Sequence, residues 1–129
     1  MVILLDTNII IDHLRQPNLT DSILSHLSLK YQSGELTIST ITIQEIFAGK
    51  STKQQKPLEK VATTLSNLEV VEYSIEIAKT AGILTRDSKT NLQLADAAIA
   101  ATALHYDASL ATLNTKDFRG IPNLKFVKL

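Results

Sequence analysis

The chain of 129 residues has no cysteine, no net charge and no long apolar run. Without cysteine it forms no disulfide, no thiolate zinc site and no cysteine nucleophile, which leaves oxygen and imidazole groups as metal ligands. Lys plus Arg and Asp plus Glu number 13 each, so nucleic-acid binding would need a local basic patch. The longest low-charge apolar run, 97–104, is too short for a membrane span. We expect a soluble, cytoplasmic protein without membrane contact.

Length and composition favour one compact domain over residues 1–129. A hydrophobic content of 44% is enough for a sizeable buried core, and 129 residues leave no room for a second domain. The three histidines share no metal-ligand spacing, which indicates surface or packing roles for them. Any catalytic chemistry is therefore expected from carboxylates.

Apolar periodicity predicts strands that alternate with helices. The continuous apolar run 2–5 is typical of a strand buried on both faces of a parallel sheet. Further strands are expected at 35–39, 68–71, 109–113 and 125–127, and helices at 9–14, 23–29, 42–48, 58–65, 74–84 and 92–105. This alternation predicts an α/β sandwich with a mainly parallel sheet, in which sites form outside the carboxyl ends of the strands.

Four acidic residues stand at strand ends or on apolar helices, where an unpaired carboxylate is normally disfavoured. They are Asp6, Glu45, Asp96 and Asp117. If they converge, two carboxylates about 4 Å apart repel by roughly 4 kcal/mol at an effective dielectric of about 20. No lysine or arginine stands beside the first three. A divalent cation is the simplest compensation.

Each acid also has an ordinary local interpretation. Asp6 could cap the helix that follows it, and Asp96 could serve at the amino end of its own helix. Glu45 stands three residues after Thr42, which is the capping-box spacing. Asp117 could belong to a turn or a surface ion pair. These alternatives stay open on the local sequence.

The most basic segment, residues 49–60, reads as an exposed connection that leads into a helix. Its lysines Lys50, Lys53 and Lys56 could contact phosphates, although a run of charge is more often a solvated face.

The order and local sequences of the acids resemble the PIN-domain family, most closely the short VapC-like toxins of toxin–antitoxin modules. The resemblance spans nearly the whole chain. It is carried by LLDTNIIIDHL at 4–14, QEIFAG at 44–49, LADAAIAATAL at 94–104 and LATLNTKDF at 110–118.

This resemblance implies a three-layer α/β/α fold and a metal-dependent endoribonuclease. Asp6, Glu45, Asp96 and Asp117 would form the catalytic cluster that binds Mg²⁺ or Mn²⁺, with Asp117 acting directly or through water. Thr7 and Asn114 match polar positions that support such a cluster. The resemblance also implies a homodimer and a cognate antitoxin, whose segment occupies the acidic groove.

Two other interpretations remain. A haloacid-dehalogenase-type phosphatase also has an aspartate after its first strand, but it needs a second one where this chain has Asn8. A non-catalytic RNA- or protein-binding module would keep the fold without the activity.

Overall fold

The chain folds as a three-layer α/β/α sandwich. The computed structural model describes the backbone of residues 1–129 and every side chain except that of Ser33. The strands are β1 (Ile3–Leu5), β2 (Leu36–Ser39), β3 (Glu69–Val71), β4 (Ser109–Ala111) and β5 (Lys125–Phe126). The α-helices are α1 (Thr7–Arg15), α2 (Ile23–Lys30), α3 (Thr40–Phe47), α4 (Gln55–Ser66), α5 (Ile75–Asp87) and α6 (Leu94–His105). Short 3₁₀ turns are η1 (Leu19–Asp21), η2 (Ser33–Glu35), η3 (Lys50–Lys53) and η4 (Thr115–Phe118). The expected fold class is confirmed.

The central sheet has the strand order β3-β2-β1-β4-β5, and each neighbouring pair is parallel. The chain moves outward from β1 through β2 to β3, and then returns to the other side of β1 to add β4 and β5. The order therefore reverses between β1 and β4, which pair through Leu4 and Leu110. In open parallel sheets such a switch point is where sites form, beyond the carboxyl ends of the two strands.

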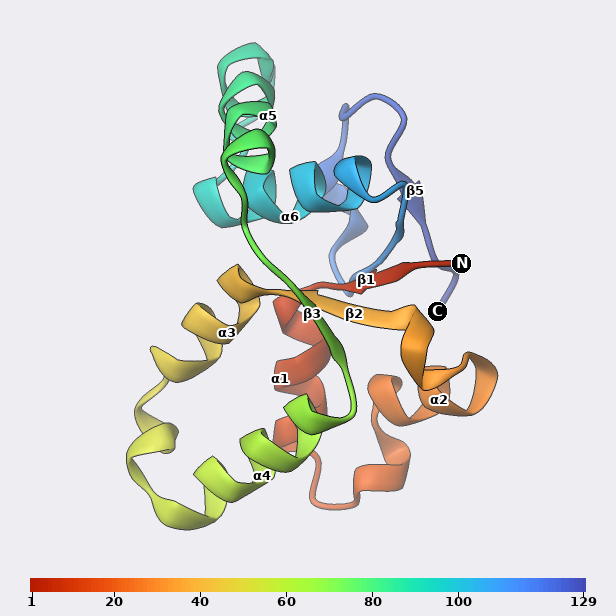
Figure 1. Ribbon diagram of the computed structural model, residues 1–129, viewed down its shortest axis with the longest axis vertical. Helices are drawn as coiled ribbons and strands as arrows, with labels where there is room; N and C mark the ends of the chain where they lie inside the picture. Colours follow the sequence, from red (N-terminus) through yellow and green to blue (C-terminus); the bar gives the residue numbers. More distant parts are fainter.

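Helices cover both faces of the sheet. Figure 1 shows α5 and α6 on one side and α1, α2 and α4 on the other. Strand β1 is buried on both faces, because Leu4 packs toward Ile99 of α6 while Ile3 and Leu5 pack with the α1 and α2 side. This arrangement explains the uninterrupted apolar run at the start of the chain.

Helix α6 is central because most of its side chains are small. Seven consecutive residues from Ala97 to Ala103 are buried, and five of them are alanine. Small side chains allow the helix to lie close to the sheet on one side and to α5 on the other, as expected for a helix that is apolar nearly all round. Its first turn, which carries Asp96, is only partly buried.

Several helix boundaries differ from the sequence-based expectation: α1 begins two residues earlier, α5 ends three residues later and α6 begins two residues later than expected. Helix α3 begins at Thr40, before the expected start at Thr42, because the Ser39 hydroxyl accepts a hydrogen bond from the Ile41 amide at 3.1 Å. Helix α4 begins at Gln55, before the expected start at Leu58, since proline is tolerated in a first helical turn and Pro57 does not delay it. No helix in the described part of the chain is long and apolar enough to cross a membrane.

Candidate functional site at the sheet switch point

Asp6 lies directly after β1, buried at the switch point. Its amide donates to the Ala111 carbonyl at 2.9 Å, which anchors it beside the end of β4. One carboxylate oxygen accepts from the Thr7 amide at 2.7 Å, and the other accepts from the Thr112 hydroxyl at 2.8 Å. Asp6 is thus the N-cap of α1, as its local interpretation expected. Because each carboxylate oxygen has two lone pairs, both oxygens keep capacity for a further partner.

Glu45 reaches Asp6's neighbourhood from α3 through a pair of threonine hydroxyls. The Thr7 hydroxyl donates to Glu45 Oε1 at 2.6 Å and lies 3.0 Å from the hydroxyl of Thr42. A hydroxyl has one hydrogen to donate, so Thr42 must be the donor to Thr7. The capping-box interpretation of Glu45 is wrong, because the N-cap of α3 is Ser39 and Thr42 lies within the helix.

Asp96 stands in the first turn of α6, which begins after the N-cap Gln93. It is therefore not the capping residue, and a carboxylate there gains only about 0.3 to 1 kcal/mol from the helix dipole. Burial first, and then the charges of the other three acids, raise the pKa of Asp96 to about 6. This carboxylate is held among like charges without compensation.

Asp117 lies in η4, the turn that follows β4, and its side chain is exposed. Its amide donates to the Asn114 carbonyl at 3.1 Å. The alternative of a surface ion pair, for which Lys116 and Arg119 lie close in the sequence, has no support, because none of the ion pairs among the described side chains includes Asp117. Asn114 contributes through its backbone, since its amide donates to the Thr112 hydroxyl at 3.1 Å.

The four acids form one electrostatic group although they come from separate segments. Burial raises the pKa of Asp6, the charges of Glu45 and Asp117 add to this effect, and the hydrogen bonds from Thr112 and Thr7 oppose it. None of the four carboxylates is in an ion pair with a described side chain. Their negative charge is therefore uncompensated by the protein.

The donor set fits a hard divalent cation. Carboxylate oxygens are the ligands that Mg²⁺ and Mn²⁺ prefer, and a cation would relieve the repulsion that raises the pKa of Asp96. In the described part of the chain no three acidic or histidine side chains are gathered closely enough to hold one ion as they stand. The chemistry of the donor set, and not the present placement of the side chains, is therefore what fits a divalent cation.

Sequence reasoning missed Thr112, which connects the two strands of the switch point. Its hydroxyl donates to Asp6 and accepts from the Asn8 side chain at 3.3 Å. Asn8 in turn accepts from the Leu113 amide at 3.2 Å, so the segment after β4 is fastened to α1. A polar residue directly after the apolar pair Leu110 and Ala111, both buried, was the available signal.

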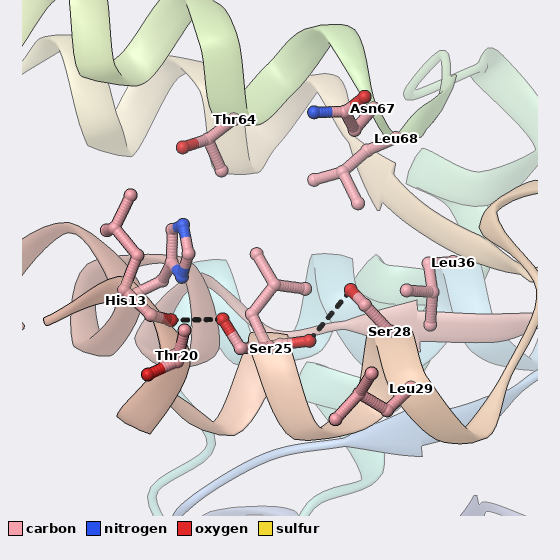
Figure 2. A pocket seen from close by; sticks show the side chains of 11 residues that line it. His13, Thr20, Ser25, Ser28, Leu29, Leu36, Thr64, Asn67 and Leu68 are labelled. Carbon is pink, nitrogen blue, oxygen red and sulfur yellow. Dashed lines mark hydrogen bonds between the residues drawn. The ribbon is translucent and has the colours of Figure 1, made fainter.

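A sizeable hollow lies away from the four acids. It has a volume of about 510 Å³ between α2 and α4, and its lining includes none of the four acids. Figure 2 shows His13, Leu36 and Thr64 around this space. His13 is a structural residue here, because its Nδ1 lies 2.7 Å from the hydroxyl of Ser22, the cap of α2. Volume alone therefore does not locate the acidic site.

The chain matches a known family over nearly its whole length. The model of the PIN domain matches residues 3–124, and the chain belongs to the PIN-domain family. Ribonuclease VapC2 of Rickettsia felis is 33% identical over 96% of this chain and 95% of its own length. The resemblance found in the sequence is thereby confirmed.

Solved structures agree with this assignment. A chain of VapBC2 from Rickettsia felis, bound to a DNA fragment from its promoter, is 26% identical with a TM-score of 0.83, covering 100% of this chain and 99% of its own. A chain of a toxin–antitoxin complex from Klebsiella pneumoniae is 31% identical with a TM-score of 0.71, covering 94% of this chain and 93% of its own.

Proposed function

We propose that the protein is a divalent-metal-dependent endoribonuclease and the toxin of a toxin–antitoxin module. The observation that carries the proposal is the presence, around the switch point of the sheet, of four carboxylates from separate segments that take part in none of the ion pairs among the described side chains. The raised pKa values of Asp6 and Asp96 agree with it. The similarity to a curated ribonuclease over nearly the whole chain supports the reaction class. The proposed catalytic and metal-binding residues are Asp6, Glu45, Asp96 and Asp117.

The residues of the site would divide the work between them. Asp6, held by Thr112 and the Thr7 amide, would give a fixed ligand at the end of β1. Glu45, held by Thr7, and Asp96 would face it from α3 and α6, with Asp117 at the rim. The chemistry that Mg²⁺ or Mn²⁺ supplies in such a site is acidification of water and neutralisation of phosphate charge.

The expected reaction is hydrolysis of an RNA phosphodiester. The carboxylates would orient a water molecule in line with the scissile bond. Its oxygen bonds to phosphorus, the bond from phosphorus to O3′ breaks, and a proton passes to the leaving oxygen. The products would carry a 5′-phosphate and a 3′-hydroxyl.

The proteins that this chain resembles support proposals about its binding partners. The similar solved structures are VapBC2 of Rickettsia felis and a toxin–antitoxin complex of Klebsiella pneumoniae, which supports a cognate antitoxin for this chain. A homodimer is proposed from the family resemblance, and sedimentation equilibrium of the purified protein checks it. The exposed Lys50, Lys53 and Lys56 remain candidates for contacts with RNA.

The test is cleavage of total RNA by the purified protein, freed of any copurifying partner, with Mg²⁺ or Mn²⁺. We expect discrete cuts that EDTA abolishes and that Asp6→Asn lacks. Glu76→Gln on the surface of α5 is the control and is expected to cut like the wild type. Unchanged cutting by Asp6→Asn would remove the mechanism. Absence of cutting by well-folded wild type under either metal would favour the binding-module interpretation.

The phosphatase alternative has little support from the site. It needs a second aspartate at position 8, where this chain has Asn8, whose side chain makes hydrogen bonds between α1 and the segment after β4. An acyl-phosphate trapped on Asp6 would revive it.

A further inference from the structure

A basic groove opens beside Glu45 between α1, α3 and α4. These helices meet on the side of the sheet opposite α6 (Figure 1). The groove, called here the α1–α4 groove, has a volume of about 430 Å³. Its apolar floor includes Leu14, Ile46 and Val61, and its cations are Arg15 and Lys60. Glu45 is the only acid in its lining, so the groove adjoins the acidic group directly.

The charge of the groove is fixed by its structure. The Lys60 ammonium donates to the carbonyls of Leu14 at 2.8 Å and Gln16 at 3.2 Å, which holds it against the end of α1. An ammonium has three hydrogens, so one remains for another partner. Arg15 is exposed and takes part in none of the ion pairs among the described side chains. Its guanidinium is free to bind an anion with up to two parallel hydrogen bonds.

Glu45 also lines a second, smaller hollow on the α6 side of α3. This hollow has a volume of about 200 Å³, and its other lining residues, which include Tyr73 and Leu94, carry no charge. The positive charge therefore lies on one side of Glu45 only. A polyanion that approaches the acidic group gains attraction from the α1–α4 groove and none from the other hollow.

We infer that the α1–α4 groove binds a nucleotide that flanks the scissile phosphodiester of a single-stranded RNA. This inference rests on the proposed function. Arg15 would hold the phosphate, while the ribose and base would cover the apolar floor, in the combination of apolar lining and a few placed polar groups typical of ligand pockets. The turn η3 carries the exposed Lys50 and Lys53 beside the lining residues Ser51 and Thr52, and so extends the positive track.

Binding of RNA without cleavage tests the groove. A short, fluorescently labelled, single-stranded RNA of random sequence is titrated in EDTA at several salt concentrations. We expect Arg15→Gln to weaken binding about tenfold at low salt, because a charge-assisted hydrogen bond is lost. The slope of log K against log salt is expected to shrink by about 0.7, the value for one phosphate contact on a single strand.

The matched control is Lys89→Gln. It removes one exposed positive charge from the connection between α5 and α6, on the other side of the sheet. It is expected to keep both the affinity and the salt slope of the wild type. If Arg15→Gln and Lys89→Gln lost RNA affinity equally, only the net charge would matter, and the proposed nucleotide site in the groove would be contradicted.

A second variant blocks the groove without removing charge. Ser51 is exposed, so Ser51→Tyr can place a ring over the groove without disturbing the core. We expect weaker RNA binding with an unchanged salt slope, and a thermal midpoint equal to that of the wild type. Affinity equal to that of the wild type would contradict a nucleotide in this space.

Cleavage separates failure of the groove from failure of the proposed function. If RNA is cut, Arg15→Gln should raise KM with little change in kcat, the sign of lost ground-state binding. If Arg15→Gln cut RNA with an unchanged KM, the nucleotide site in the groove would be contradicted, while the proposed nuclease activity would stand. A wild type that neither binds nor cuts RNA would remove the proposed function and the groove together. If Arg15→Gln lost binding to a partner protein but kept binding to RNA, the groove would be a site for that partner, and the inference would be wrong.

Discussion

At the scale of single residues, the orientation of Glu45 depends on the Thr42 hydroxyl, which acts through Thr7 and does not contact Glu45 itself. Glu45 is exposed on α3, and its described hydrogen bond is the one from Thr7. Thr7 is oriented in turn by Thr42, whose side chain is fully buried. A buried group with one fixed donor direction can hold the position of an exposed carboxylate, which a long glutamate side chain would not keep by itself.

Thr42→Val tests this role because valine has nearly the shape of threonine without the hydroxyl. We expect kcat for RNA cleavage to fall about tenfold with little change in KM, since Glu45 loses its orientation while substrate contacts remain. Thr64→Val is the control, because Thr64 is buried and its hydroxyl donates to a backbone carbonyl of α4. Equal losses of activity in both variants would indicate a general structural effect. Stability should fall by about 1 kcal/mol in each.

The raised pKa of Asp96 predicts how stability depends on pH in the absence of metal. The folded-state pKa is about 6 and the ordinary value is 3.8. Between these values the folded chain binds more protons than the unfolded chain, so this group's contribution to stability is present below pH 3.8 and is lost as the pH rises through 6. Asp96→Asn keeps a neutral side chain at every pH. In EDTA, its thermal midpoint should exceed that of the wild type by a margin that grows over this window and then stays constant.

Asp107→Asn is the control, because the pKa of Asp107 is shifted in the direction opposite to that of Asp96. The hydrogen bond from Lys125, followed by its charge, lowers the pKa of Asp107, so its small contribution is present above the ordinary pKa. Asparagine is tolerated at its positive φ of 50°. We expect a thermal midpoint at neutral pH equal to or slightly below that of the wild type. A margin for Asp96→Asn that does not change with pH would refute the coupling of the four acids.

The sequence indicated the four acids and Thr7, whose hydroxyl holds Glu45, but not the hydroxyls of Thr112 and Thr42. Asp6 follows a buried strand and Asp96 stands in an uncharged helix, and both anomalies are visible without coordinates. Thr112 and Thr42 look ordinary in the sequence, because threonine is common at strand ends and helix starts. Their roles depend on which side chains face them across the fold.

At the scale of secondary-structure elements, α4 stabilises the end of α1. The Lys60 ammonium binds two carbonyls at the carboxyl end of α1, which would otherwise lack partners. Its positive charge also complements the negative end of the helix dipole. This contact joins two helices that are far apart in the sequence.

Lys60→Met should therefore destabilise the fold, because methionine keeps most of the apolar stem but not the ammonium. We expect a loss of about 1 to 2 kcal/mol in the free energy of unfolding, measured with urea. Lys56→Met, one turn earlier and exposed, should change it by less than about 0.5 kcal/mol. Equal stability of the two variants would contradict a role for Lys60 at the end of α1.

Apolar periodicity predicted the type of each helix and strand but not every boundary. The start of α3 was missed because Thr40 and Ile41 are β-branched and fit the preceding strand as well as a helix. The Ser39 cap decides the boundary. For strand β3 the position of the strand was predicted but not its burial. It was expected from apolar residues, but it lies at the sheet edge with Glu69 and Val70 exposed.

At the scale of the whole molecule, the strand order creates the site. The alternation of strands and helices predicted a parallel sheet, but no local pattern shows that β4 returns to pair with β1. That return brings Thr112 into contact with Asp6, and brings Asp117 close enough for its charge to raise the pKa of Asp6. Asp96 comes from α6, which covers the face of the sheet opposite to that of α1 (Figure 1). The convergence of the acids is thus a property of topology.

Direct binding of Mn²⁺, followed by electron paramagnetic resonance, tests the central claim that the four acids form one cation site. The wild type should take up Mn²⁺ at neutral pH, Mg²⁺ should compete, and Asp6→Asn and Asp96→Asn should each weaken binding by at least tenfold. Glu69→Gln, an exposed acid on the edge strand, should bind like the wild type. Equal Mn²⁺ affinity in all four proteins would contradict the account.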